Sequence, residues 1–351
     1  MTKPGEPILD LRARPLGVLR LSLTARCNLA CPYCCPDPHD PQGLLTLPQQ
    51  LRLIRAACLL GAHTLRITGG EPLLSDRLVP LLEAIDVGRG TAGDPLQSLE
   101  EIALTSNGVL LDPQRARRLR SAGLTRITIS LDGADGGSVA RMAGLQGGAV
   151  AGERLLTRVI SGLNAAAMAG FDPDVGELKL NTVLQRGVND DQLIPLADLA
   201  RHHGVELRFI EYMDVGNRNG WRRDRVVPAA DIVRCLEGCW PLEPLHRVEG
   251  RTARRWRYRD GGGIVGVIAS ISEPFCQDCN RLRVAADGKA FTCLFASKGK
   301  DLRPWLQADS SEEALIVAMV GLWSRRLDRF SEERQALPLG AAHAEMAYLG
   351  G

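Results

Sequence analysis

The chain has 351 residues, and 43 Lys and Arg side chains against 41 Asp and Glu leave a net charge of +2. With 45% hydrophobic and 24% charged residues it has the composition of a globular protein that buries a core without disulfides. Its length predicts two domains, or one large barrel with an appendage. The near-neutral charge gives no electrostatic basis for binding a nucleic acid or a membrane surface, and the longest apolar run, 314–323, is too short to cross a bilayer.

Short β-branched or apolar runs alternate with helical stretches from residue 16 to about residue 210. Parallel strands need crossover helices, so this alternation predicts βα units around a parallel sheet. Six units are too few for a closed eight-stranded barrel, and we therefore expect a partial, open-sided (βα)6 barrel. The expected strands are 16–24, 64–68, 102–106, 126–131, 178–184 and 205–210. The expected helices are 48–61, 78–85, 113–122, 154–169 and 192–203.

The pattern changes after residue 211. Residues 254–259 and 264–272 read as two strands of a hairpin joined by the turn 260–263, and 311–327 reads as a helix. We therefore predict an N-terminal segment (1–15), the barrel (16–211) and a C-terminal domain (212–351). The segments 87–100 and 133–152 are expected to be surface loops.

Ten cysteines are more than this composition would lead one to expect, and six of them form two groups. The first twenty residues contain no apolar segment typical of a secretory signal. We therefore predict a cytoplasmic location, where grouped cysteines indicate metal ligation or catalysis rather than disulfides. The other four, Cys35, Cys58, Cys235 and Cys239, are interpreted as ordinary buried thiols.

Cys27, Cys31 and Cys34 follow the first expected strand with a C-x3-C-x2-C spacing. Three thiolates on one loop can bind three irons of a [4Fe–4S] cluster, which leaves the fourth iron open for a small molecule. The position supports this interpretation, because catalytic loops of βα barrels follow the C-terminal ends of strands. The alternative is a structural zinc site, although Cys35 is poorly placed to be its fourth ligand.

Cys276, Cys279 and Cys293 form a second incomplete set, for which a zinc site is again the alternative. Arg281 and Arg283 follow it directly. Residues two apart on an extended segment point to the same side, so the two guanidiniums would suit a polyanion such as a triphosphate. The alternative is that they lie on a solvated strand face.

The first cysteine set, with an aromatic residue before its third member, resembles the radical S-adenosylmethionine superfamily. Gly69-Gly70-Glu71-Pro72 resembles the segment with which that superfamily binds the methionine amino group. The two cysteine sets, the Arg-x-Arg and the segments 178–191, 208–216 and 275–294 together resemble the GTP 3′,8-cyclase family of molybdenum cofactor biosynthesis. Gly350 and Gly351 are similar to the diglycine tail of that family, which reaches into its active site.

The resemblance implies a role for each matching residue. Two [4Fe–4S] clusters would be bound by Cys27, Cys31 and Cys34 and by Cys276, Cys279 and Cys293. S-adenosylmethionine would contact Tyr33, Gly70, Glu71, Ser130 and Met213. GTP would contact Arg20, Arg66, Thr105, Lys179, Arg208, Arg281 and Arg283. Arg281, Arg283, Gly350 and Gly351 would also take part in catalysis.

Arg20, Arg66, Lys179 and Arg208 all lie on expected barrel strands. They are either barrel-wall charges or ligands of an anion, and buried cations without an anionic partner are costly. The implied reaction begins with a 5′-deoxyadenosyl radical that takes the C3′ hydrogen of GTP, after which C3′ bonds to C8 of guanine.

The implied partners are GTP and a reductant such as flavodoxin or ferredoxin, in a monomer or a homodimer. Two other readings remain open. One is a radical enzyme with an auxiliary cluster that acts on a peptide or another substrate, and the other is a zinc-binding interaction module without enzymatic activity.

Overall fold

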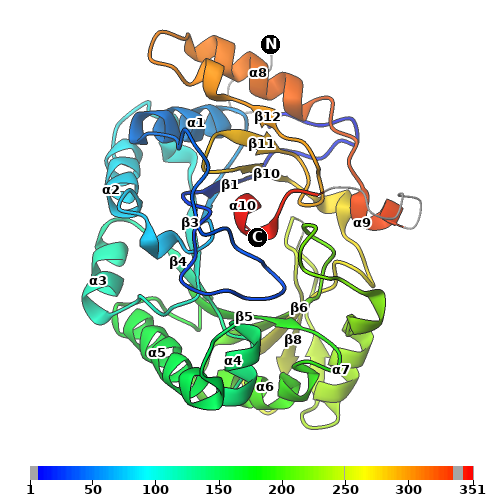
Figure 1. Cartoon of the computed structure of the whole chain (residues 1–351). Helices are drawn as coiled ribbons and strands as arrows, with labels where there is room; N and C mark the ends of the chain where they lie inside the picture. Colours follow the sequence, from blue (N-terminus) through cyan, green and yellow to red (C-terminus); the bar gives the residue numbers. More distant parts are fainter. Residues whose placement is uncertain (1–6, 249, 335–342, 351) are drawn as a thin grey trace.

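The computed structural model describes residues 7–248, 250–334 and 343–350. Its centre is a twelve-stranded sheet with the order β12-β11-β10-β1-β2-β3-β4-β5-β6-β9-β8-β7. The eight neighbouring strands from β10 to β9 are all parallel. They curve into an open barrel with helices around the outside (Figure 1). The predicted α/β class and partial barrel are confirmed.

The six expected barrel strands are all present, within two residues of their predicted ends. They are β1 (Val18–Ser22), β2 (Thr64–Thr68), β3 (Glu101–Ser106), β4 (Arg126–Ser130), β5 (Leu178–Leu184) and β6 (Glu206–Glu211). The crossover helices are α1 (Leu47–Leu59), α2 (Leu78–Arg89), α3 (Pro113–Ser121), α5 (Gly148–Met168) and α6 (Leu193–His202). Their starts have local causes, such as the capping box of Thr46 and Gln49 on α1 and the Asp112 cap on α3.

The C-terminal half adds a strand to each side of the barrel. The expected hairpin forms β8 (Arg254–Tyr258) and β9 (Ile264–Ile268), and β9 pairs in parallel with β6. β10 (Arg281–Val284) pairs in parallel with β1. β7 (Leu242–Pro244), β11 (Lys289–Phe291) and β12 (Lys300–Asp301) complete the two outer edges. One sheet therefore continues across the predicted domain boundary, because pairing between distant strands leaves no local sequence pattern.

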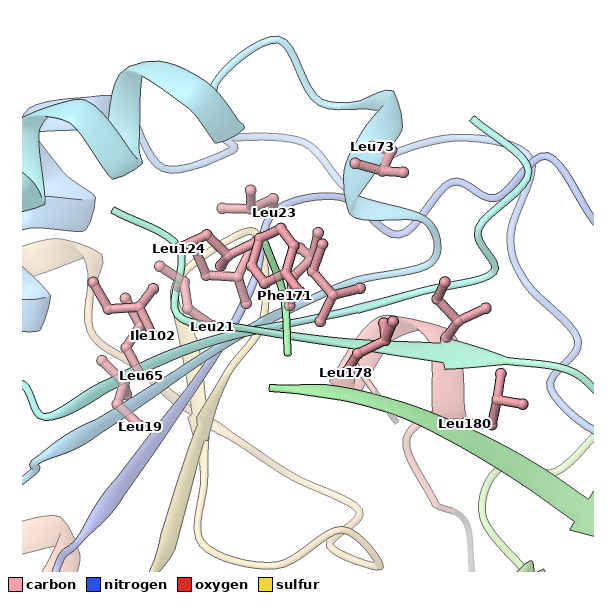
Figure 2. Packing of buried hydrophobic residues seen from close by; sticks show 14 of the residues in the cluster. Leu19, Leu21, Leu23, Leu65, Leu73, Ile102, Leu124, Phe171, Leu178 and Leu180 are labelled. Carbon is pink, nitrogen blue, oxygen red and sulfur yellow. The ribbon is translucent and has the colours of Figure 1, made fainter. Parts of the chain in front are cut away.

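Alternation along each strand separates the core from the barrel interior. Leu19 and Leu21 of β1 pack with Leu65 of β2 and Ile102 of β3 in the layer between strands and helices (Figure 2). Arg20, between the two leucines, faces the cavity inside the barrel. The period of two is what a strand imposes on successive side chains, and it places hydrophobic residues outward and polar residues inward.

The segment 133–152 is not a surface loop, so this expectation was wrong. It contains α4 (Gly136–Met142), which packs closely on the first turns of α5. A Cβ on Gly152 would lie 1.7 Å from the carbonyl oxygen of Gly136. The glycines that make this stretch look loop-like are thus the residues that let two helix backbones approach. Segment 87–100 is likewise partly helical, since α2 runs to Arg89 and a short 3-10 turn, η2 (Pro95–Ser98), follows.

The remaining helices belong to the C-terminal half: α7 (Ala229–Glu237), α8 (Glu312–Trp323), α9 (Phe330–Glu333) and α10 (Met346–Leu349). The other 3-10 turns are η1 (Pro72–Leu74), η3 (Asp190–Gln192), η4 (Arg223–Arg225), η5 (Cys276–Asp278) and η6 (Arg303–Trp305). Figure 1 shows α10, in red, inside the ring of strands, so the end of the described chain lies in the barrel. In the described ranges no helix is long and apolar enough to cross a membrane.

Candidate active site

One cavity inside the barrel brings together most of the residues that the sequence singled out. All six grouped cysteines line it, with Tyr33, Gly70, Ser130 and Met213. So do Arg20, Arg66, Thr105, Arg208, Arg281 and Arg283. Its lining residues do not include Glu71, Lys179 or Gly350, and Gly351 lies outside the described residues. The two cysteine sets, 242 residues apart between Cys34 and Cys276, therefore share one chamber.

The first cysteine set lies on the loop that leaves β1. The amides of Cys34 and Cys35 both donate to the carbonyl oxygen of Cys31, at 3.0 and 2.9 Å, and this tight turn gathers the thiols. Burial, and then the neighbouring Cys27 thiolate, raise the pKa of Cys34 to about 12. Asn107, just after β3, places its Nδ2 atom 3.7 Å from Cys27 Sγ. Burial and mutual repulsion disfavour three thiolates on one loop, so the donor set fits a cationic iron–sulfur cluster that would compensate their charge.

The second cysteine set lies beside cationic side chains. Arg326 donates from Nη2 to Cys279 Sγ (3.1 Å) and from Nη1 to the carbonyl oxygen of Cys279 (2.6 Å). Burial acts to raise the pKa of Cys279, but Arg281 and Arg326 outweigh it and lower the pKa to about 6. A thiolate stabilised in this way is prepared for a metal. No pattern in the sequence indicated Arg326, which lies three residues after the end of α8 and reaches Cys279.

Across the part of the chain that the structure describes, no three His, Cys, Asp or Glu side chains are arranged to hold a single metal ion.

The 69–72 segment, whose Gly69 and Gly70 line the cavity, also packs closely on the first cysteine loop. A Cβ on Gly70 would lie 2.2 Å from the carbonyl oxygen of Arg26, so the glycine permits close packing on the start of the cysteine loop. Glu71 is fully buried. Its carboxylate accepts hydrogen bonds from the amides of Leu73 and Asn107 and from the Ser106 hydroxyl, at 2.8 to 3.0 Å. Glu71 therefore holds the loop after β3 and does not face the cavity.

Three arginines occupy one register across neighbouring strands. Arg20 of β1 is paired with Arg283 of β10 on one side and with Arg66 of β2 on the other. Burial, and next the charge of Arg281, lower the pKa of Arg283 to about 10. Within the described residues, Arg66 Nε, Arg281 Nε and Arg283 Nη1 are buried without a hydrogen-bond partner. Arg66, Arg281 and Arg283, which carry like charges in one cavity and keep these unused donors, fit a bound polyanion.

Lys179 and Arg208 already have an anionic partner, which the sequence interpretation missed. Glu206, at the start of β6, accepts from Lys179 Nζ at 2.8 Å and from Arg208 Nε at 2.6 Å. Burial acts to raise the pKa of Glu206, yet Arg208 and Lys179 lower it to about 2. For Lys179 and Arg208, an anion within the barrel wall therefore already supplies the counter-charge. Glu206 and Arg208 are two apart on one strand, and this spacing could have revealed the pair.

Polar residues just after β3 and β4 shape the side of the cavity next to Tyr33. The Tyr33 hydroxyl donates to Asp132 Oδ2 at 2.7 Å, and the amide of Val183 donates to Oδ1 at 2.7 Å. Burial raises the pKa of Asp132 to about 6, although these two bonds oppose the rise. Asp132 and Asn107 both line the cavity and were missed. Their position directly after a barrel strand is the signal that could have identified them.

The C-terminal tail reaches the arginine row. The carbonyl oxygen of Gly350 accepts from Arg20 Nη2 at 2.6 Å. Gly350 has φ +67°, and a Cβ there would lie 2.0 Å from Thr68 Oγ1. Both the left-handed backbone and the close contact require glycine at this position. The Tyr348 hydroxyl, bonded to Asp287 Oδ1 at 2.8 Å, anchors the same tail to the turn between β10 and β11.

The four remaining cysteines are not all core thiols. Cys58 is buried, but Cys235 and Cys239 are exposed and Cys35 is half-buried. Cys35 also has a left-handed backbone, with φ +48°. The expectation was therefore wrong for three of the four, because a cysteine's position along a helix or loop does not by itself fix its burial.

Comparison with known proteins assigns the chain to a family. Residues 21–200 match the radical SAM superfamily, and residues 205–332 match the family described as Molybdenum Cofactor Synthesis C. A GTP 3′,8-cyclase of Synechococcus sp. (strain WH7803) is 64% identical over 348 residues, 99% of each chain. A GTP 3′,8-cyclase of Acidothermus cellulolyticus is 42% identical, again over 99% of both chains.

Solved structures share the fold at low identity. Streptococcus suis SuiB bound to the precursor peptide SuiA has a TM-score of 0.60 at 14% identity, covering 93% of this chain and 68% of that one. Native anSMEcpe with bound AdoMet has a TM-score of 0.54 at 15% identity, covering 94% and 93%. These likenesses concern the fold alone. The full-length identity to the cyclases, on a barrel whose cavity holds both cysteine sets and the arginine row, shows that the chain belongs to the GTP 3′,8-cyclase family of the radical SAM superfamily.

Proposed function

We propose that this chain cyclises GTP to (8S)-3′,8-cyclo-7,8-dihydroguanosine 5′-triphosphate, the first step of molybdenum cofactor biosynthesis. The observation that carries the proposal is the cavity itself, whose lining includes a row of arginines and both sets of three cysteines. A triphosphate supplies the charge that the arginines require, and each cysteine set supplies three of the four ligands of a cluster.

The enzyme uses two [4Fe–4S] clusters and S-adenosylmethionine as cofactors. Cys27, Cys31 and Cys34 would hold the first cluster, and Cys276, Cys279 and Cys293 would hold the second. Tyr33, Gly70, Ser130 and Met213, which share the cavity with the first set, would line the S-adenosylmethionine site. When bound, the first cluster and S-adenosylmethionine would supply the radical chemistry that removes the C3′ hydrogen of GTP, so that C3′ can bond to C8 of the guanine.

The protein's own task is to position GTP and to exclude competing reactants. Arg66, Arg281 and Arg283 would bind the phosphates through their unused N–H donors. Arg20 and Arg208 line the same cavity, and Lys179, behind Glu206, would contribute its charge from a distance. Thr105 would contact GTP from β3. The tail residue Gly350, bonded to Arg20, would close the cavity beside the phosphate-binding arginines. Gly351, which follows it in the sequence, would also act there.

The proposal includes an external one-electron donor such as flavodoxin or ferredoxin and a reducing, cytoplasmic setting. Both follow from thiolate-bound clusters that must be reduced before each turnover.

The test is anaerobic incubation of the reconstituted enzyme with GTP, S-adenosylmethionine and dithionite. We expect 5′-deoxyadenosine and the cyclised triphosphate in equal amounts. R281Q/R283Q should abolish GTP binding, whereas R257Q/R259Q should not. The control pair has the same two-residue spacing but is exposed, at and just after the end of β8. Formation of 5′-deoxyadenosine without any cyclised triphosphate would show that the substrate assignment is wrong.

The same preparation separates the two other readings. About eight irons with matching sulfide per chain are expected for two clusters, whereas stoichiometric zinc would exclude both enzyme readings. GTP binding that is unaffected by R281Q/R283Q would favour a radical enzyme that acts on a peptide or another substrate.

A further inference from the structure

Three segments that are distant in the sequence meet at one partly exposed side chain, Arg218, in the loop after β6. Its Nη1 donates to Asp37 Oδ1 and its Nη2 to the carbonyl oxygen of Cys35, both at 2.8 Å. Its Nε lies 3.3 Å from Glu345 Oε1. Asp37 and Cys35 belong to the first cysteine loop, and Glu345 directly precedes α10 in the tail.

Two neighbouring residues of the same loop, Gly216 and Asn217, make further contacts with the tail. Asn217 donates from Nδ2 to the carbonyl oxygen of His343 (2.7 Å) and accepts from the amide of His343 (3.1 Å). Its own amide donates to Glu345 Oε1 at 3.1 Å. At Gly216, a Cβ would lie 2.3 Å from Glu345 Oε2, so the glycine lets the tail come this close.

The start of the tail is also tied to the second cysteine loop. The Nδ1 atom of His343 is 2.7 Å from the carbonyl oxygen of Phe295, and the amide of Ala344 donates to the carbonyl oxygen of Ala296. Phe295 lies two residues after Cys293 and lines the cavity. Residues 343–345 are therefore held between the two cysteine loops, and Arg218 makes the connection to the first.

The geometry of a guanidinium explains what this connection does. Its N–H donors lie in one plane at fixed angles, so three partners can be bound together only in one relative arrangement. Cys35, with its left-handed φ of +48°, lies directly after the ligand-position Cys34, and its carbonyl oxygen is one of the three partners. Five residues further along the chain from Glu345, Gly350 contacts Arg20 in the cavity.

We propose that Arg218 is a positioning residue. It fixes the C-terminal tail relative to the first cysteine loop and thereby holds Gly350 in its contact with Arg20 at the cavity. This inference rests on the proposed function for its catalytic consequence. The contact itself does not rest on it, because it is made by side chains and backbone atoms of this chain alone. Exposed ion pairs contribute little to global stability, and the Arg218 side chain is 46% exposed, so its loss should act on the tail rather than on the whole fold.

The test compares R218Q with R222Q in the reconstituted full-length enzyme. Arg222 lies in the same loop, and its pair with Asp224 is fully local. Hydrogen exchange in peptides covering 346–350 should accelerate by about tenfold or more in R218Q and stay at the wild-type rate in R222Q. The kcat for GTP should fall by about tenfold or more in R218Q while GTP affinity stays within about twofold, since the phosphate-binding arginines are untouched.

Charge reversal tests the Glu345 contact specifically. R218E and E345R should each accelerate exchange in the tail, and the double variant R218E/E345R should restore part of the protection. Unchanged tail exchange in R218Q would overturn the proposal, as would faster exchange without a change in kcat. Faster exchange throughout the chain would also overturn it, by making Arg218 a general stabilising residue. Because exchange is measured without turnover, absence of the cyclised product in the wild type would count against the proposed function alone.

Discussion

Glu206 divides the cations of the barrel wall into two groups. It is an inward-facing carboxylate, 5% exposed, and it neutralises Lys179 and Arg208 while Arg66, Arg281 and Arg283 keep unused donors. The sequence showed the cations, but their pairing depended on the parallel register that sets Lys179 opposite Glu206. At the scale of single residues, strand alternation was predictable and charge pairing across strands was not.

The substitution E206Q should destabilise the protein strongly. It leaves buried Arg208 without a counter-charge and removes the anion bonded to Lys179, whose pKa burial and Arg208 lower to about 7, and breaking a buried ion pair from one side costs about 3–5 kcal/mol. Urea unfolding at pH 7.5 measures this cost. E243Q, at an exposed glutamate on β7, is the control and should change the free energy of unfolding by less than about 0.5 kcal/mol. Equal stability of E206Q and the wild type would contradict the role given to Glu206.

Asp132 gives a prediction about pH. Burial raises its pKa from 3.8 to about 6 in the folded state. Between these two values the folded state binds more protons than the unfolded state, so stability falls as the pH rises through this window. The penalty reaches about 3 kcal/mol above pH 7 and is roughly half of that at pH 5.

The neutral variant D132N keeps one oxygen acceptor for the Val183 amide, its Nδ2 can donate to the Tyr33 hydroxyl oxygen, and it does not carry this penalty. Its melting temperature should therefore exceed that of the wild type at pH 7.5, and the gain should shrink at pH 5. Anaerobic thermal unfolding at the two pH values is the measurement. A difference between variant and wild type that does not vary with pH would refute the assignment of the raised pKa.

At the scale of elements, the strands and most helices followed from period and capping signals, whereas α4 did not. Its sequence begins with two glycines and lies near Gly147 and Gly148, which favour a loop when only local propensity is considered. The helix exists because it packs on α5, and its residues Val139 and Met142 then line the cavity. Tertiary packing thus outweighed propensity at an element that shapes the site.

Two glycine substitutions separate the effect of tertiary packing from the effect of helix propensity. G152A places a methyl group against the backbone of Gly136, and we expect a loss of about 1–3 kcal/mol together with lower activity as α4 moves. G321A lies inside α8 with nothing within 4 Å of the added Cβ, and it should stabilise the protein by about 0.5–1 kcal/mol. Chemical unfolding of both variants is the measurement. Stabilisation by G152A would mean that the close crossing of α4 and α5 is not needed.

At the scale of the whole molecule, the active site is assembled from both ends of the chain. The first strand carries Arg20, and the last described residue, Gly350, bonds to it. The segment that follows the barrel supplies β9 and β10, so two of the phosphate-binding candidates, Arg281 and Arg283, become part of the barrel wall. A net charge of +2 is compatible with this, because the cations are concentrated in one cavity.

The variant G350A tests the tail contact. An alanine there combines an unfavourable left-handed backbone with a clash on Thr68, so the tail should leave its place and cyclisation should fall by about tenfold or more. 5′-Deoxyadenosine and the cyclised product are measured in the same reaction. Their ratio shows whether G350A still forms the radical when it no longer cyclises GTP. G170A, also at positive φ but with nothing within 4 Å, is the control and should retain activity. If G350A cyclised GTP at the wild-type rate, the tail contact would have no part in the mechanism.

The barrel class, the grouping of the six cysteines and the Arg-x-Arg beside the second group could be predicted from the sequence, because they depend on periodicity and on short spacings along the chain. Three other facts could be learned from the fold alone. Both cysteine sets line one cavity, Glu206 pairs with two of the cations, and Arg326, Asp132 and Asn107 lie at the cysteine sets or in the cavity wall. These facts depend on the register between strands and on contacts between residues up to 330 positions apart, such as Arg20 with Gly350. No local pattern records such contacts, since they are selected by the packing of the whole chain.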